Sequence, residues 1–265
     1  MIIGQAKCLV LIKNKFFWEL FCALSYINIF IGLFFLTYLP NTPLCRYFKW
    51  KAAIVLVGDE FHKVNLDKNR EKLAKHFAHD TPLQEELSEL VVWTKDAEIK
   101  VLDVGAGPVS KVGKCINGQP IVIVPVDPMA EKYRALLESL CLKPKFWTVP
   151  GMGETLSQQF EPNSFDLAHA RNCLDHSLEP LKAIMEVLTV LKPGCYFYLN
   201  HYRNEGNAAK YYGLHQWNFD VVDNIFAITS RFGDVVNVNQ AIEGVARIHS
   251  ISVSNERLVV IIQKR

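Results

Sequence analysis

The chain has 265 residues, half of them hydrophobic, which is enough for one α/β domain with a sizeable core and an extension. Its formal net charge is +2 and its charges are interspersed, so no basic stripe indicates a nucleic-acid substrate. The seven cysteines form no C-x-x-C pair and are odd in number, which argues against a zinc knuckle and against a secreted disulfide framework. They are expected to be reduced thiols in a cytosolic setting.

The first segment, residues 1–45, is strongly hydrophobic. No charged side chain occurs from Leu20 to Cys45, and the stretch Leu20 to Leu39 has about the 20 residues that a helix needs to cross a bilayer. A membrane-spanning helix is therefore predicted, with a buried helix or a misassigned start as the alternative. Basic residues flank the stretch almost equally on both sides, so the positive-inside rule does not fix its orientation.

The second segment, residues 46–98, has a different pattern. From about Asn65 to Trp93, acids and bases alternate with apolar residues at mixed three- and four-residue spacings, and Thr81–Pro82 interrupts them. This pattern predicts two amphipathic helices that precede the main domain.

The third segment, residues 99–265, alternates strand and helix patterns, which predicts a mostly parallel sheet covered on both faces. The predicted strands are Val101–Val104, Ile121–Val126, Lys145–Val149, Phe165–Ala170 and Cys195–Asn200, and the helices include Glu131–Leu140 and Pro180–Leu191. The stretches Ala246–Ser252 and Leu258–Gln263 are joined by a turn at 254–256 and predict a closing antiparallel hairpin. The fold class predicted is α/β.

The most informative stretch is VLDVGAGPVS, residues 101–110. A β-branched run stops at Gly105, and the pair Gly105 and Gly107 lets the backbone turn tightly against a ligand. Asp127 ends the next apolar run about 20 residues after Gly107, the spacing at which α/β nucleotide folds place a ribose-binding acid. The stretch predicts a ribose-bearing cofactor. As an alternative, Asp127 could cap a helix, because Pro128 follows at a position suited to a first turn.

Two cofactor classes compete for this arrangement. The dinucleotide fingerprint requires a third glycine three positions after Gly107, where this chain has Ser110. Asp103 lies where the first strand ends, and a carboxylate there suits the ammonium and sulfonium groups of S-adenosylmethionine but would repel a pyrophosphate. The local charge therefore favours S-adenosylmethionine over NAD.

Four motifs now occur in a fixed order: DVGAGP at 103–108, VPVDP at 124–128, FDLAHARNCLDH at 165–176 and LKPGCYFYL at 191–199. With them the chain, from about Val101 to the C-terminus, resembles the class I S-adenosylmethionine-dependent methyltransferases. The resemblance implies a Rossmann-like methyltransferase sheet and S-adenosylmethionine as cofactor. It also implies that the preceding helices cover the cofactor or shape the acceptor pocket.

Ligands of open α/β sheets bind at the carboxyl ends of the strands, so the residues just after each strand are site candidates. The predicted cofactor-binding residues are Asp103, Gly105, Gly107, Asp127, Pro128, Met152, Gly153 and Arg171. At Met152 the family often has an acid for the adenine amino group, and this chain departs from that pattern. Met152 could pack on the adenine ring while the Gly153 backbone hydrogen-bonds its edge, and Glu154 could simply begin a helix.

Polar and aromatic side chains follow the last parallel strand, at 200–205 and 211–219, and indicate a substrate-binding loop. The predicted substrate-binding residues are Asn204, Glu205, Tyr212, His215 and Trp217. An aromatic lid that packs over the domain is the alternative for the aromatic residues. No metal site is predicted.

The predicted catalytic residues are Asn172, His176 and His201. The resemblance places the stretch with Asn172 and His176 opposite the transferred methyl group, where an amide can orient an acceptor and an imidazole can take a proton. His201 is preferred as the base because it adjoins the predicted acceptor loop. A structural histidine is the alternative in both positions.

The sequence thus predicts a methyltransferase held at a membrane, with its catalytic domain on the cytosolic side, where S-adenosylmethionine is made. The expected acceptor is a small molecule, a lipid or a lipid-linked glycan, because a membrane anchor raises the local concentration of such acceptors. The rival functions are a catalytically silent S-adenosylmethionine-binding module and an NAD-linked oxidoreductase or epimerase.

Overall fold

The computed structural model describes residues 43–54, 75–92, 98–211 and 213–265. The predicted membrane segment Leu20–Leu39 and much of the predicted helical stretch lie outside these residues. The chain divides into two compact units, Met1–Glu60 and Phe61–Arg265, and each is described by itself. In the first unit the described residues form α4 (Pro43–Ala53). Across the described ranges, no helix has both the length and the apolar character that a membrane crossing requires.

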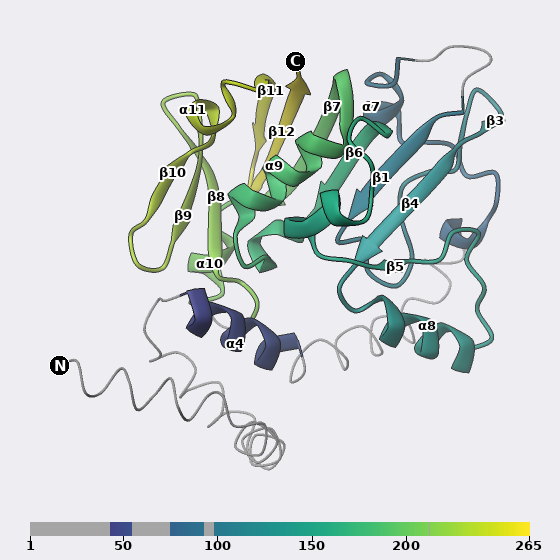
Figure 1. Cartoon of the computed structure of the whole chain (residues 1–265), viewed down its shortest axis with the longest axis horizontal. Coiled ribbons are helices and arrows are strands. Elements are labelled where there is room, and N and C mark those ends of the chain that lie inside the picture. The colour runs from purple at the N-terminus through teal and green to yellow at the C-terminus, as the bar shows by residue number, and fades with distance from the viewer. Residues whose placement is uncertain (1–42, 55–74, 93–97, 212) are drawn as a thin grey trace. The chain divides into compact units, whose positions relative to one another are not determined.

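A seven-stranded sheet in the order β11-β12-β7-β6-β1-β4-β5 forms the second unit. The strands are β1 (Lys100–Val104), β4 (Val122–Asp127), β5 (Val149–Pro150), β6 (Phe165–Arg171), β7 (Leu191–Tyr202), β11 (Ala246–Ser254) and β12 (Arg257–Lys264). Five neighbouring strands of this sheet, β5, β4, β1, β6 and β7, are parallel to one another, and β12 runs antiparallel to β7. Figure 1 shows this reversal, because the arrowheads of β4 and β12 point to opposite edges.

Both faces of the sheet are covered, as its alternating apolar side chains require. Leu102, Ala168 and Phe197 belong to the cluster that packs with α9 (Pro180–Val190), whereas their neighbours Val101, Leu167 and Tyr198 belong to the cluster that packs with α7 (Glu85–Ser88). A smaller cluster packs against α8 (Ala130–Ser139). The prediction of a mostly parallel, two-sided sheet is confirmed.

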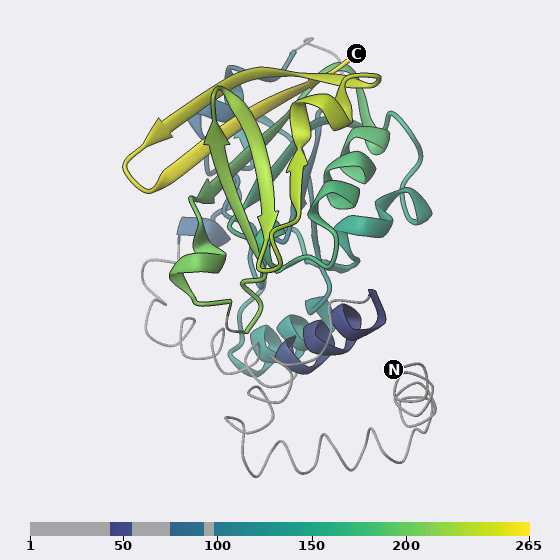
Figure 2. The ribbon, with the colours of Figure 1, turned by 90° about the vertical axis from the view of Figure 1, so that its left-hand side faces the viewer.

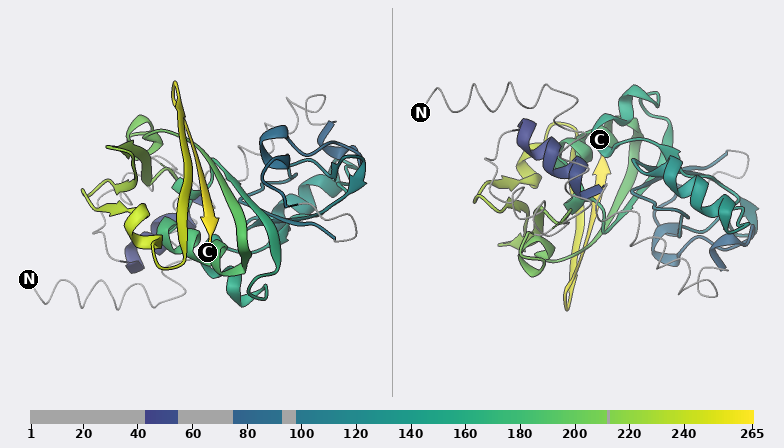
Figure 3. Two further views of the ribbon diagram at one scale, coloured as in Figure 1. Left: turned by 90° about the horizontal axis from the view of Figure 1, so that it is seen from above. Right: turned by 90° about the horizontal axis from the view of Figure 1, so that it is seen from below.

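The closing antiparallel hairpin is also confirmed. Strands β11 and β12 pair with each other through a two-residue turn at Asn255 and Glu256, and Asn255 has a φ of 52°. The same pairing carries a β-bulge between Ile248 and Ser250. Views from above and below show this hairpin reaching beyond the neighbouring strands (Figure 3).

A second sheet follows β7 and was not predicted. It contains β8 (Trp217–Val222), β9 (Ile225–Ser230) and β10 (Val235–Asn237), and α11 (Val238–Ile242) comes next. Figure 2 shows these strands as a small sheet of their own beside α9 and the closing hairpin. The predicted loop at 211–219 is therefore wrong from residue 217 onward, where Trp217 and Phe219 begin a strand and are buried.

Two further predictions need correction. The predicted strand Lys145–Val149 is wrong in its bounds, because the structure has only the short strand β5 there. β5 is an edge strand that pairs only with the last two residues of β4, and Pro144 before it and the turn at Gly151 after it limit its length. The second predicted amphipathic helix is reduced to the four residues of α7. The backbone before it instead joins the short hairpin of β2 (Cys115–Ile116) and β3 (Gln119–Pro120), where Leu83 N donates to Cys115 O at 2.8 Å.

The remaining short helices lie at the carboxyl edge of the parallel strands. They are η2 (Gly153–Gln158), η3 (Leu174–His176) and α10 (Glu205–Ala208), which follow β5, β6 and β7 respectively. Parallel strands bring their carboxyl ends to one edge, so these helices and the glycine turn after β1 share that edge.

Candidate active site

The glycine turn after β1 is fixed by close packing and by hydrogen bonds to β4. Gly105 and Gly107 have φ values of 64° and 67°, a region that favours glycine. Gly105 N donates to Val126 O at 2.8 Å. A Cβ atom at Gly105 would lie 2.3 Å from the Cβ of Cys173, so the turn also excludes any larger residue. The turn therefore presents backbone without side chains at the end of β1, as the sequence predicts for a cofactor-binding turn.

Asp127 connects this turn to the end of β4. Its carboxylate accepts hydrogen bonds from Gly107 N at 3.1 Å and from Met129 N at 2.9 Å. Burial raises the pKa of the Asp127 carboxyl to about 6, against the opposing effect of the two backbone amides. A carboxylate has about four lone-pair sites, so two remain for the hydroxyls of a ribose. The residues present therefore fit the ribose of S-adenosylmethionine, and the bond to Met129 shows a turn-forming role as well.

Asp103 is buried and fully engaged within the domain. Its two oxygens accept from Ser110 Oγ at 2.6 Å and pair with His169 Nδ1 at 2.7 Å. His169 in turn stacks on Tyr198 at 5.9 Å between ring centroids. Asp103 thus connects β1 to β6 and to the loop that follows the glycine turn. Its contact with a cofactor stays a prediction.

The other predicted cofactor residues lie at the same edge. Pro128 and Arg171 are exposed where β4 and β6 end, and Met152 is half-buried before η2. A Cβ at Gly153 would lie 3.1 Å from the Cβ of Ala183, so this glycine permits close packing on α9. Their roles in binding adenine or methionine groups stay predictions.

Glu154 has a clear structural role. It is buried, and its Oε1 accepts from Leu178 N at 2.7 Å and from Glu179 N at 3.3 Å. These amides lie just before α9, where helix N-termini present unpaired donors. Glu154 therefore anchors α9 to η2 rather than facing the open edge.

A cluster of ionisable side chains lies after β6 and β7, and we call it the Asp175 cluster: Asp175, His176, His201, Glu205 and His215. Asp175 Oδ2 lies 2.7 Å from His215 Nδ1 and 3.4 Å from His176 Nε2. The two imidazole nitrogens lie 3.1 Å apart. Glu205 Oε1 lies 3.9 Å from His215 Nδ1, and His201 Nδ1 lies 3.8 Å from Asp175 Oδ1.

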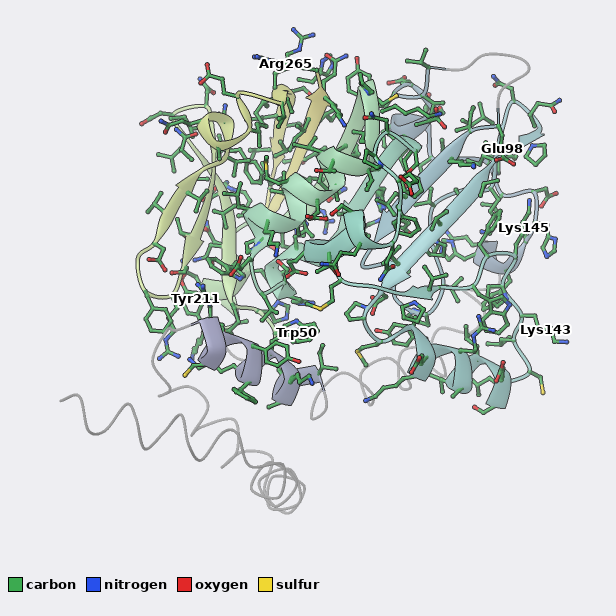
Figure 4. All side chains as sticks on the ribbon, viewed as in Figure 1. Trp50, Glu98, Lys143, Lys145, Tyr211 and Arg265 are labelled. Carbon is green, nitrogen blue, oxygen red and sulfur yellow. The ribbon has the colours of Figure 1, made fainter. Side chains whose placement is uncertain are left out.

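The backbone around this cluster is tied together across the two strand ends. Gln216 N donates to Asp175 O at 3.1 Å, and Trp217 Nε1 donates to Ser177 O at 2.9 Å. The loop before β8 is thus fixed to η3. Tyr211, which belongs to this loop and is labelled in Figure 4, lies at the edge of the sheet toward which β4 points, whereas Arg265 lies at the opposite edge.

The charges of the cluster shift its pKa values in different directions. Burial alone would raise the pKa of Asp175, but the charge of His176, the hydrogen bond from His215 and the charge of His201 lower it overall. Burial opposes the charged form of His215, yet the hydrogen bond and the charge of Asp175 raise its pKa. Burial lowers the pKa of His176, and burial with nearby positive charges lowers that of His201 to about 4. Burial and the charge of Asp175 raise the pKa of Glu205.

The predicted catalytic residues differ in how open they are. His201 is only 2% exposed and stacks on Phe219 at 4.7 Å between ring centroids, whereas the side chains of His176 and His215 are each 32% exposed. Asn172 has a φ of 48°, and its Oδ1 accepts from Tyr202 N at 3.2 Å. Asn172 thus joins the ends of β6 and β7, and its role toward an acceptor stays a prediction.

The predicted substrate residues are partly brought together. Glu205 and His215 belong to the Asp175 cluster, while Asn204 Nδ2 donates to Asp220 Oδ2 at 2.6 Å and so braces the start of α10. Trp217 is buried under η3 through its bond to Ser177. Tyr212 lies outside the described residues. Asp175 is not among the predicted site residues, because its central position depends on contact with His215, which lies 40 residues further along the chain.

The fold and the glycine turn with Asp127 define an α/β domain whose residues fit a ribose-bearing cofactor. Residues 102–199 match the family model of a methyltransferase domain, a match that begins in β1 and ends in β7. This match supports a class I S-adenosylmethionine-dependent methyltransferase domain, with S-adenosylmethionine as its cofactor.

Solved structures with similar folds include a putative S-adenosylmethionine-dependent methyltransferase from Methanococcus maripaludis, with 17% identity over 78% of this chain and 92% of that chain and a TM-score of 0.48. Another is an S-adenosylmethionine-dependent methyltransferase from Aquifex aeolicus, with 17% identity over 77% of this chain and 97% of that chain and a TM-score of 0.41. No protein with curated function matches the chain.

Proposed function

We propose that the chain is an active enzyme that transfers the methyl group of S-adenosylmethionine to an acceptor bound against the Asp175 cluster. The observation that carries this proposal is the convergence of five ionisable side chains at the strand edge that also bears the cofactor turn. A module that only binds the cofactor has no need of such a cluster, since burying ionisable groups costs free energy.

The cofactor turn and the cluster are physically linked. Cys173 Sγ donates to Val104 O at 3.2 Å and fills the space above Gly105, and Asp175 follows two residues later in the chain. This contact fixes the distance between the two parts of the site. Methyl transfer from a sulfonium is an in-line displacement, so alignment of the acceptor is the main contribution that a protein makes.

The remaining contribution is a place for the acceptor's proton. A hydroxyl or amine acceptor loses a proton as its oxygen or nitrogen forms the new bond to carbon, and the cluster offers carboxylate and imidazole acceptors for it. We assign the acceptor-facing positions to His176 and His215, because His201 is enclosed beneath β8. In this arrangement His201, whose Nδ1 lies 3.8 Å from Asp175 Oδ1, positions the Asp175 carboxylate, and the base is His176 or His215 in place of the His201 expected from the sequence.

We further propose that the acceptor is a lipid or a lipid-linked glycan rather than a nucleic acid. The uncharged stretch Leu20–Leu39 supports this proposal, because a membrane tether raises the effective concentration of acceptors in the same bilayer. The methyl donor is cytosolic, so the domain would lie on the cytosolic side.

The direct test is transfer of isotope from methyl-labelled S-adenosylmethionine into a membrane extract and, in parallel, into an aqueous extract. We expect label in an organic-soluble product with the wild-type chain and, at a subsaturating concentration of S-adenosylmethionine, about 10- to 100-fold less label with Asp127→Asn. Label only in the aqueous extract would overturn the lipid assignment. Binding of S-adenosylmethionine without transfer to either extract would favour the silent module.

A further inference from the structure

Three side chains of the Asp175 cluster place a potential metal-binding atom at nearly the same point. The atoms are Asp175 Oδ2, His176 Nε2 and His215 Nδ1, separated by 2.7, 3.1 and 3.4 Å. They come from two parts of the chain, η3 and the loop before β8, and the backbone bond from Gln216 to Asp175 holds those parts together. Carboxylate and imidazole are ordinary ligands of Zn²⁺ and related ions.

Hydrogen bonds satisfy this group of atoms only in part. A neutral imidazole carries one N–H, so of two nitrogens 3.1 Å apart at most one donates to the other, and the second presents a lone pair. In addition, the other oxygens of two carboxylates in the cluster, Asp175 Oδ1 and Glu205 Oε2, are buried and have no hydrogen-bond partner among the described residues. The cluster therefore holds more carboxylate oxygen than its hydrogen-bond donors satisfy, and a bound cation would offset this excess of negative charge.

We infer that Asp175, His176 and His215 bind a divalent transition-metal ion, with Zn²⁺ as the best-suited ion. A triangle with sides of 2.7, 3.1 and 3.4 Å has a circumscribed radius of about 1.8 Å. An ion about 1 Å off its plane therefore lies about 2.05 Å from all three atoms, the usual length of Zn–N and Zn–O bonds.

The surroundings favour a transition metal with an open position. Two imidazoles and one carboxylate suit Zn²⁺, Co²⁺ or Fe²⁺, whereas Mg²⁺ prefers oxygen ligands alone. Glu205 Oε1, at 3.9 Å from His215 Nδ1, is near enough to serve as a fourth ligand or to bond a metal-bound water. His176 and His215 are each partly exposed, so a further position faces the open edge.

The role of the ion rests on the proposed function, whereas its binding does not. An acceptor hydroxyl bound at the open position would lose its proton more readily, because a divalent cation stabilises the oxyanion. Such an ion would favour oxygen as the methylated atom. The reaction would then leave the proton on Glu205 or on solvent as the new carbon–oxygen bond forms.

The test uses the full chain, purified in mild detergent without an affinity tag and stripped with a chelator. Zn²⁺ binding is measured by titration calorimetry for the wild type, Asp175→Asn, His215→Ala and the control His249→Ala, whose imidazole is exposed on β11. We expect one equivalent of Zn²⁺ in the wild type and in the control, and affinity about 100-fold weaker or worse in the two site variants. An S-adenosylmethionine affinity equal to that of the wild type in all three variants verifies their fold.

Co²⁺ substitution provides a second readout that needs no variant. We expect visible d–d absorption of a four- or five-coordinate ion, which Zn²⁺ abolishes by competition and millimolar Mg²⁺ does not. Absence of stoichiometric Zn²⁺ binding, equal binding by the site variants, or displacement by Mg²⁺ would overturn the metal site. Zinc binding without methyl transfer would overturn the proposed function alone. Full transfer by protein from which the chelator has removed all zinc would overturn the role of the ion in transfer.

Discussion

Asp127 gives the clearest prediction for a single residue. We expect Asp127→Asn to weaken S-adenosylmethionine binding by about 10- to 100-fold, because the ribose loses a charge-assisted acceptor worth roughly 1.5–3 kcal/mol. The same change also disturbs the bonds to Gly107 and Met129, so the turn itself loosens. Titration calorimetry on the folded variant measures the loss.

Asp166→Asn is the matched control for this variant. Asp166 also lies on a central strand, and its Oδ1 accepts from Lys192 Nζ at 2.6 Å. It stands near the start of β6, however, so it lies at the edge of the sheet opposite the cofactor turn. Its affinity for S-adenosylmethionine should equal that of the wild type. Unchanged affinity in Asp127→Asn would remove the ribose assignment.

The buried carboxyl of Asp127 also predicts a pH dependence. With a pKa of about 6, roughly a tenth of these carboxyls are ionised at pH 5, so cofactor affinity should fall by up to about 10-fold between pH 7.5 and pH 5. Stability has the opposite sign, because a raised pKa means that the native state holds its proton more tightly than the unfolded state. The free energy of unfolding should therefore fall as pH rises from about 4 to 6.

Calorimetry at several pH values and urea unfolding without cofactor measure the two effects. Asp127→Asn removes the titrating group, so both profiles should flatten over this range. A wild-type affinity that stays constant from pH 7.5 to pH 5 would show that Asp127 is not the group in contact with the ribose.

Asp127 and Asp175 differ in how well the sequence predicts them. Asp127 ends a strand pattern at a fixed distance from Gly107, so local periodicity and spacing are sufficient to find it. Asp175 acquires its partners only when the loop with His215 packs on η3, and no local pattern encodes a contact across 40 residues. A carboxylate directly before a histidine at a strand end was the available signal.

At the level of an element, the glycine turn predicts a stability difference between two substitutions. Gly105→Ala and Gly194→Ala both force alanine into a positive φ, of 64° and 78°, at a cost of roughly 1–2 kcal/mol. Only the Cβ at Gly105 meets Cys173, since the space around Gly194 is open to 4 Å. Because of this overpacking, the free energy of unfolding of Gly105→Ala should be about 1–3 kcal/mol lower than that of Gly194→Ala.

Urea unfolding of both variants checks this difference. Gly105→Ala should also weaken cofactor binding, because the displaced Cys173 segment moves with the turn, while Gly194→Ala should bind normally. Equal stability of the two alanine variants would show that the turn is not packed against Cys173.

The helices and strands were predictable where the pattern of apolar residues was long and regular. The apolar runs that became β1, β4, β6 and β7 are buried on both faces, so their sequence reads as strands. The β8–β9 pair was missed although its turn, Asp223–Asn224, has φ values of 51° and 62° and is a two-residue hairpin turn. Two polar residues between apolar runs are a hairpin signal that the aromatic content of the region obscured.

For the whole molecule, the uncharged stretch Leu20–Leu39 predicts the behaviour of the full chain in cells. We expect it in the membrane fraction after a carbonate wash, with a reporter fused to the C-terminus on the cytosolic side. The control is the same fusion with two lysines introduced into the stretch, which should reduce membrane retention. Recovery of the unaltered chain in the soluble fraction without detergent would contradict this prediction.

The central claim is that one edge of the sheet binds S-adenosylmethionine and presents an acceptor to it through the Asp175 cluster. The most direct measurement compares cofactor affinity and labelled-methyl transfer in the wild type and Asp175→Asn. Because Asp175 contacts both acceptor-facing imidazoles and lies outside the ribose contacts, we predict an affinity within about 2-fold of the wild type and transfer reduced by about 100-fold or more. Undiminished transfer, or equal loss of binding and transfer, would contradict the account.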